Sequence, residues 1–154
     1  MATEAPPDEP PNAEFTLQLV YLKDCSFEAP KGPRFDARNW APNIALDLDT
    51  AVESLGEHAR EIVLTVSVTA KVGEETIFIA EVKQAGAFVI RGLSDSDFRR
   101  AVASVGPSLL FPYARATISQ LVSQGGFPQL LLPPVNFEAL YARSLAEAQT
   151  ATKN

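Results

Sequence analysis

Few side chains in this chain could take part in covalent or metal chemistry. Its single histidine, His58, stands in a polar stretch, where a solvated loop or helix-turn residue is a better interpretation than a general base. Its single cysteine, Cys25, lies at strand spacing from Tyr21 and Phe27, so we interpret it as a small apolar side chain rather than a nucleophile. One histidine and one cysteine cannot provide a usual zinc site. The residue types therefore predict no catalytic residue.

Carboxylates are the remaining candidates for chemistry. Asp47 and Asp49 alternate with apolar residues, which places both on the polar face of a strand, where they could coordinate a hard cation. Two carboxylates without further ligands are a weak indication of a metal, and we expect none. The sequence has no glycine-rich phosphate loop of the Walker type, so we expect neither ATP use nor another cofactor. A binding protein is favoured over an enzyme, and the alternative is a small-ligand carrier or enzyme with a cleft between sheet and helices.

The charge of the chain is unevenly distributed. Its net charge is −6, and residues 24–81 contain eleven acidic against five basic side chains, whereas residues 95–154 contain four against five. The acidic half disfavours nucleic acid as a partner and suits either a basic partner or a face kept soluble by charge. No apolar run approaches the ~20 residues of a membrane span, and the N-terminus lacks the pattern of a secretory signal. With one cysteine, these features predict a cytoplasmic protein without direct membrane insertion.

Alternation of apolar and polar residues predicts four strands. They cover residues 15–28, 44–49, 61–71 and 76–90. In the first strand, Asp24 and Glu28 share a face because the side-chain period of a strand is two. Gly86 predicts a bulge or bend in the fourth strand. A long loop at residues 29–42 carries Trp40, whose ring is either tucked into the core or held out as a contact.

Apolar residues at spacings of three and four predict two helices after the strands. The first begins at Ser94 or Asp95 and is interrupted at Pro112, where a proline removes a backbone donor. The second begins after Asn136, a favourable N-cap. The connector between them, residues 127–136, is apolar and rich in proline, so it should be stiff and extended. It must lie either on the protein's own body or on another chain.

This element order predicts an α+β fold, with a four-stranded antiparallel sheet followed by two helices packed on one side. Residues 14–149 form the single domain, between an acidic proline-rich disordered tail at 1–13 and a frayed tail at 150–154. Three of the strands carry apolar residues at both sets of alternate positions. We therefore expect the second sheet face to meet another copy, giving a homo-oligomer formed by sheet contact.

Five segments resemble the SecB family of bacterial protein-export chaperones, in the order and spacing of that family. They are residues 21–30, 46–50, 73–82, 110–115 and 127–137. The resemblance runs from about Phe15 to Ala148, although Ile79 stands where leucine is expected. It implies a homotetramer, a dimer of dimers, that holds precursor proteins unfolded without ATP and passes them to SecA, the motor ATPase of the membrane translocase. A SecB-like chaperone serving a toxin and antitoxin pair is the alternative.

The same resemblance implies two sites. In this family an acidic sheet surface receives the basic, zinc-bearing C-terminal segment of the motor. The positions that match that surface are Asp24, Glu28, Ile79 and Glu81. Clients bind in apolar grooves bounded by the loop after the first strand and by the last helix. The groove positions are Phe27, Trp40, Phe137, Leu140 and Tyr141. Several grooves on one tetramer would raise the affinity for an unfolded chain through effective concentration.

Overall fold

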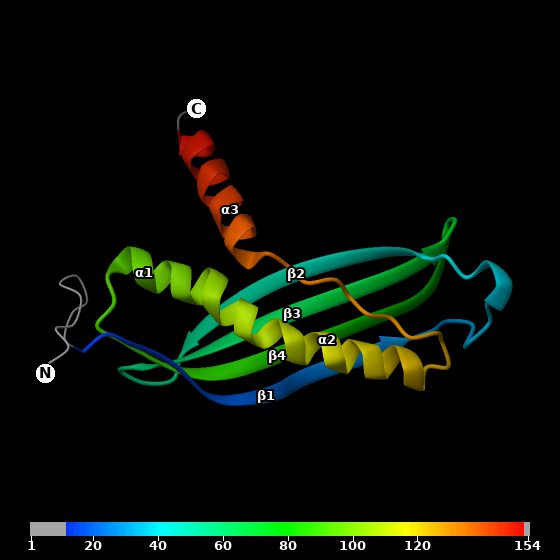
Figure 1. Cartoon of the computed structure of the whole chain (residues 1–154), viewed down its shortest axis with the longest axis horizontal. Coiled ribbons are helices and arrows are strands. Elements are labelled where there is room, and N and C mark those ends of the chain that lie inside the picture. The colour runs from blue at the N-terminus through cyan, green and yellow to red at the C-terminus, as the bar shows by residue number, and fades with distance from the viewer. Residues whose placement is uncertain (1–11, 153–154) are drawn as a thin grey trace, which may run out of the picture.

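Four long antiparallel strands form one sheet in the computed structural model, which describes residues 12–152 (Figure 1). The strand order is β1-β4-β3-β2, so β1 and β2 are the edges. The strands are β1 (Glu14–Glu28), β2 (Asn43–Ser54), β3 (Ala59–Val72) and β4 (Glu75–Arg91). Each of the four predicted strands is present and runs further than its pattern indicated. Of the tail predicted for residues 1–13, all but the last two residues lie outside the described part of the chain.

The core lies between this sheet and the long helical segment that follows it. On β3, the side chains from Ile62 to Ala70 alternate between fully buried positions toward the helices and half-buried positions on the opposite side. We call the helix-covered side of the sheet the helix face and the other side the outer face. The outer face of β3 is formed mainly by glutamate, serine and threonine rather than by large apolar residues. The apolar second face from which sheet-to-sheet contact was predicted is therefore not present on β3.

Two bulges in β1 explain why its apolar residues occupy both sets of alternate positions. The pairing of β1 with β4 shifts between Leu17 and Leu19 and again between Leu22 and Asp24. Each extra residue turns the following side chains to the other face. Gly86, where we predicted a bulge or bend, lies in a stretch of β4 whose pairing does not shift, so no bulge forms there. The irregularity of β4 lies instead at Ile77, the extra residue between Thr76 and Phe78 in the pairing with β3.

The helical segment after the sheet is continuous through Pro112, where we had predicted an interruption. It consists of α1 (Asp95–Arg100), a π-helical turn η2 (Ala101–Val105) and α2 (Gly106–Gln124), with Ser94 as the N-cap. The Gly106 N–H donates to the Ala101 carbonyl, so the wide turn lies directly before Pro107, which has no N–H to offer. Pro112 is exposed, so the carbonyl that loses its helical partner can bind water instead.

The last helix, α3 (Phe137–Thr152), does not pack on the sheet along its length. It begins as predicted, because Asn136 Oδ1 accepts a hydrogen bond from the Ala139 N–H at 3.0 Å. Among its described side chains only Phe137 is buried, and the helix projects past the β2 edge of the sheet (Figure 1). Its base is attached to the preceding helical segment by Glu138, which contacts Arg100 at 2.9 Å and Ser104 at 2.7 Å. The prediction of helices packed on one side of the sheet thus describes α2 but not α3.

Candidate functional site

The four residues predicted as an acidic docking surface lie together on the outer face. In the ladder between β1 and β4, Asp24 pairs with Lys83, Ser26 with Glu81, and Glu28 with Ile79. Directly paired residues point to the same side of a sheet, so the carboxylates of both strands are neighbours. We call Asp24, Glu28, Ile79 and Glu81 the acidic patch. The Ser67 hydroxyl on β3 donates to Glu81 at 2.9 Å, which fixes one carboxylate of the patch.

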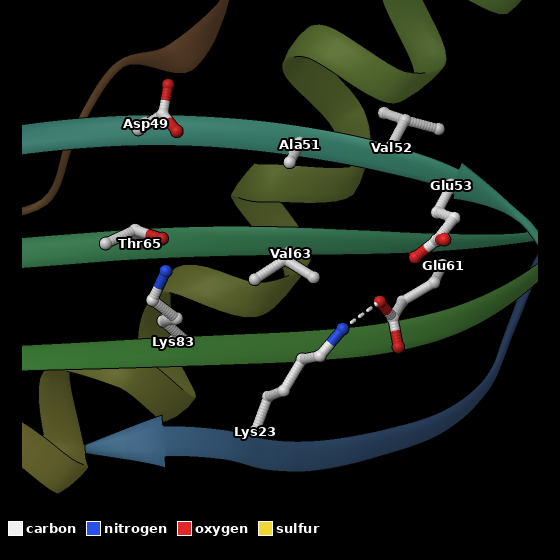
Figure 2. Close-up of a pocket in the computed structure, with 9 residues that line it drawn as sticks. All are labelled: Lys23, Asp49, Ala51, Val52, Glu53, Glu61, Val63, Thr65 and Lys83. Atoms are coloured by element: carbon white, nitrogen blue, oxygen red, sulfur yellow. Dashed lines mark hydrogen bonds and ion pairs between the residues drawn. The ribbon is translucent and has the colours of Figure 1, made fainter.

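A second arrangement on the outer face, which the sequence did not indicate, lies beside the acidic patch. Lys23 extends from β1 across β4 to Glu61 on β3, with 2.6 Å between Nζ and Oε1 (Figure 2). The Tyr21 hydroxyl donates to the other oxygen of the same carboxylate. We call these three residues the bracket. No spacing rule in the sequence could find it, because β1 and β3 are not neighbours and their register is set by β4.

The contacts within the bracket shift the pKa values of Glu61 and Tyr21. Hydrogen bonds from Lys23 and then from Tyr21 hold the pKa of the Glu61 carboxyl below its usual value. Burial, followed by the hydrogen bond to Glu61, raises the pKa of Tyr21 to about 12. Glu61 is nevertheless a structural rather than a catalytic carboxylate, because both of its oxygens are already engaged. It lines a shallow hollow of about 420 Å³ together with Lys83 and residues of β2.

On the helix face, Trp40 belongs to a cluster of aromatic rings. Its ring stacks on Phe127 with 5.9 Å between centroids and lies 4.8 Å from the ring of Phe35. Phe27 and Phe78 complete the cluster, with their centroids 6.2 Å and 5.1 Å from that of Phe127. Trp40 is therefore tucked against the body of the protein, one of the two alternatives that the sequence left open. It remains half-buried, so part of its ring is accessible.

The other three predicted groove residues form a separate group at the base of α3. Phe137, Leu140 and Tyr141 line a hollow of about 360 Å³ with residues of β2, η2 and α3. The connector at residues 127–136 joins the two groups, since Phe127 at one end belongs to the aromatic cluster and Phe137 follows the other end. Phe127 and Leu132 of the connector are buried, whereas Leu131 is 68% exposed. The connector thus packs on the protein's own body and still presents apolar surface.

The residues first considered for chemistry are scattered. His58 lies in the turn between β2 and β3, about half exposed, as predicted for a solvated histidine. Cys25 is exposed and, because of the bulge at Lys23, faces the side opposite to Tyr21, so the strand spacing that grouped it with Tyr21 was misleading. Within residues 12–152, no group of three or more His, Cys, Asp or Glu side chains is placed to hold a metal ion. Over the same range, no helix is long and apolar enough to cross a membrane.

The architecture is that of a known class of proteins. A SecB-like chaperone of Mycobacterium tuberculosis, solved in complex with a peptide from an antitoxin, superimposes with a TM-score of 0.67 over 79% of this chain and 90% of that one. At 16% identity this likeness shows the fold alone: the chain has the α+β fold of SecB-like proteins.

Comparison of sequences identifies the family. The family model of SecB, preprotein translocase subunit, matches residues 8–148. The protein-export protein SecB of Stutzerimonas stutzeri is 50% identical over 139 residues, which cover 90% of this chain and 85% of that protein. The protein-export protein SecB of Pseudomonas fluorescens strain Pf-5 is 46% identical over 147 residues, covering 96% and 92%. The chain belongs to the SecB family, as its five segments predicted.

Proposed function

We propose that this protein is a cytoplasmic, ATP-independent chaperone that holds precursor proteins unfolded and delivers them to the SecA motor for export. The proposal rests on one observation: the two faces of the same sheet present different kinds of side chain. The outer face presents a carboxylate patch that suits a basic partner. The helix face and α3 present aromatic and aliphatic side chains that suit unfolded segments of many sequences. Binding on opposite faces would let one molecule hold a client and contact the motor together.

Assembly into a homotetramer, a dimer of dimers, is part of the proposal. Exposed apolar side chains recur every four residues along the helical segment, at Val105, Leu109 and Tyr113. They form a stripe on the side of the helix away from the buried Leu110 and Ala114. Leu19 and Leu22 are also exposed on the edge strand β1, the first on its outer face and the second on its helix face, so apolar side chains flank this edge on both sides. Two separate apolar surfaces of this kind support two different contacts between copies, which is what a dimer of dimers requires.

Protein export is favoured over service to a toxin and antitoxin pair. The relatives that are 46–50% identical to this chain are named protein-export proteins, whereas the chaperone solved with an antitoxin peptide is 16% identical. The chain also has the carboxylates of Asp24, Glu28 and Glu81 on one surface. We therefore propose SecA as the partner of the acidic patch.

The holding activity is tested by light scattering with an unfolded precursor protein diluted from urea. We expect a particle near four times 16.6 kDa that gains the mass of the unfolded precursor but not that of the same protein after folding. A monomer or dimer that ignores the unfolded precursor would overturn the proposal. Stoichiometric binding of a small molecule, without any effect on refolding, would instead indicate a ligand carrier.

The delivery step is tested by calorimetric titration with purified SecA. Reversing one charge of the acidic patch with Glu81→Lys should weaken binding about tenfold or more, because it places an ammonium against a basic partner. Glu147→Lys is the matched control, since it makes the same change on an exposed position of α3. Equal SecA affinity of Glu81→Lys and the control would remove the acidic patch from the proposal and leave the holding activity to be judged on its own test.

A further inference from the structure

The acidic patch exists because β1 contains one residue more than its partner strand at Lys23. Leu22 pairs with Gln84 and Asp24 with Lys83, so Lys23 is the extra residue. Tyr21 and Asp24 both face outward although they are three positions apart. Without the bulge, strand alternation would turn Asp24, Ser26 and Glu28 onto the helix face and bring Cys25 and Phe27 outward. The presentation of two of the three patch carboxylates therefore depends on one local irregularity.

Side chains on the outer face hold the residues at this bulge. Lys23, the extra residue itself, lies 2.6 Å from Glu61, and Tyr21 two positions earlier donates to the same carboxylate. The carboxylate is reached across β4, which presents only Ala85 and Ala87 there, opposite Tyr21 and Glu61 respectively. Larger side chains at those two positions would separate the members of the bracket. The side chain of Glu61 is 10% exposed, so its two partners replace most of its hydration.

Two further contacts fix the bulge from the helix face. A bulge disturbs the ladder and leaves backbone groups without their usual partners. Gln84, which is buried, donates from Nε2 to the Tyr21 carbonyl at 3.0 Å and satisfies that group. Phe27, four residues beyond Lys23, inserts into the aromatic cluster at 5.7 Å from the ring of Phe78. The bulge is thus bound on both faces, and on the outer face Glu61 holds the extra residue, Lys23, together with Tyr21 before it.

We propose that Glu61 is a positioning residue for the acidic patch: by holding Tyr21 and Lys23 on one carboxylate, it keeps the extra residue at Lys23 and turns Asp24 and Glu28 toward the partner. Glu61 need not touch the partner to act in this way. The inference rests on the proposed function, because the patch is itself a proposed SecA site. A loss of the bracket lowers the apparent affinity for SecA in proportion to the fraction of molecules whose Asp24 and Glu28 still face outward.

The test uses the full chain, purified SecA and calorimetry. Glu61→Leu removes the acceptor of both hydrogen bonds and should weaken SecA binding about tenfold, as expected if about a tenth of the molecules keep the outward register. Glu75→Leu is the matched control, because it also removes one negative charge and one ion pair, that with Lys31 at 2.7 Å, away from the bulge. Exchanging the two charges, Lys23→Glu with Glu61→Lys, restores the ion pair at constant net charge and should recover most of the affinity.

A second readout reports the register directly. Cross-strand contacts between Asp24 and Lys83, measured by NMR, should weaken in Glu61→Leu and return in the charge-exchanged variant. Holding of an unfolded precursor, which uses the other face, shows that each variant is folded. If Glu81→Lys loses SecA binding while Glu61→Leu keeps both its affinity and its register, the positioning role is overturned and the proposed function stands. If Glu81→Lys binds normally, the docking proposal fails, and unchanged register in Glu61→Leu would overturn the role of Glu61 as well.

Discussion

Leu110 of α2 packs directly on Gly86 of β4. A Cβ on Gly86 would lie 3.0 Å from Leu110 Cδ2, 2.9 Å from Leu17 Cδ1 and 2.8 Å from Phe88 Cε2. The missing side chain is therefore what lets the helix approach the sheet this closely. Leu110 and Phe88 are almost fully buried, so neither can turn aside into solvent.

Gly86→Ala should lower the free energy of unfolding by about 1–3 kcal/mol, the usual range for an extra methyl group in a filled core. Denaturant titration with unchanged slope would measure it. A second variant, Gly86→Ala with Leu17→Ala, removes one of the three atoms that obstruct the new methyl group. The free energy of unfolding of this double variant should fall by less than the sum of the decreases in the two single variants. Strict additivity of the two decreases would contradict the crowding argument.

The raised pKa of Tyr21 gives the protein a specific alkaline sensitivity. The folded chain keeps the hydroxyl proton up to about pH 12, whereas an unfolded tyrosine releases it near pH ~10. The unfolded state therefore binds fewer protons between these values, and the free energy of unfolding should fall as the pH rises through this window. In Tyr21→Phe this decrease in the free energy of unfolding with rising pH should be absent. Identical profiles for Tyr21→Phe and the unaltered protein would count against the Tyr21–Glu61 hydrogen bond.

The sequence was sufficient for the strands and for placing Asp24 and Glu28 on one face of the sheet. The alternating pattern of β3 is unbroken, and the 72–75 turn between β3 and β4 follows from Gly73, which adopts a φ of 61°. Asp24 and Glu28 could be placed on one face because both follow the second bulge, so the period of two holds between them.

The sequence was insufficient wherever position depended on pairing across strands. The bulges at residues 18 and 23 have no glycine or proline to mark them, and they are visible only when β1 is aligned with β4. Glu61 looked like one more polar residue of an alternating strand, because its partners come from a strand that is not its neighbour. The direction of α3 depends on the long connector, whose prolines predict an extended path but not where it leads.

The apolar stripe on the long helix makes a prediction about assembly. Leu109→Asp should reduce the mass from about four chains to about two, because a charge in the middle of an apolar contact loses its hydration without gaining a partner. Leu55→Asp makes the same change at a half-exposed leucine in the turn between β2 and β3 and should leave the mass unchanged. Light scattering at several concentrations distinguishes the two variants. A tetramer that survives Leu109→Asp would show that copies do not meet on this stripe.

Trp40→Ala should weaken the binding of clients more than it weakens assembly. Its ring stacks on Phe127 and contacts Phe35, yet it remains half-buried, so an unfolded segment can reach the aromatic cluster through it. Each aromatic pair contributes about 0.5–1.5 kcal/mol beyond its buried area, so Trp40→Ala should weaken binding of an unfolded precursor about tenfold. Leu55→Ala, an apolar truncation far from the cluster, is the matched control for a general loss of hydrophobic surface. Client affinity would be followed by the delay in precursor refolding and assembly by light scattering. Unchanged client affinity in Trp40→Ala would exclude the cluster from the groove and leave the hollow at Phe137, Leu140 and Tyr141 as the client site, because the lining of that hollow includes no ring of the cluster.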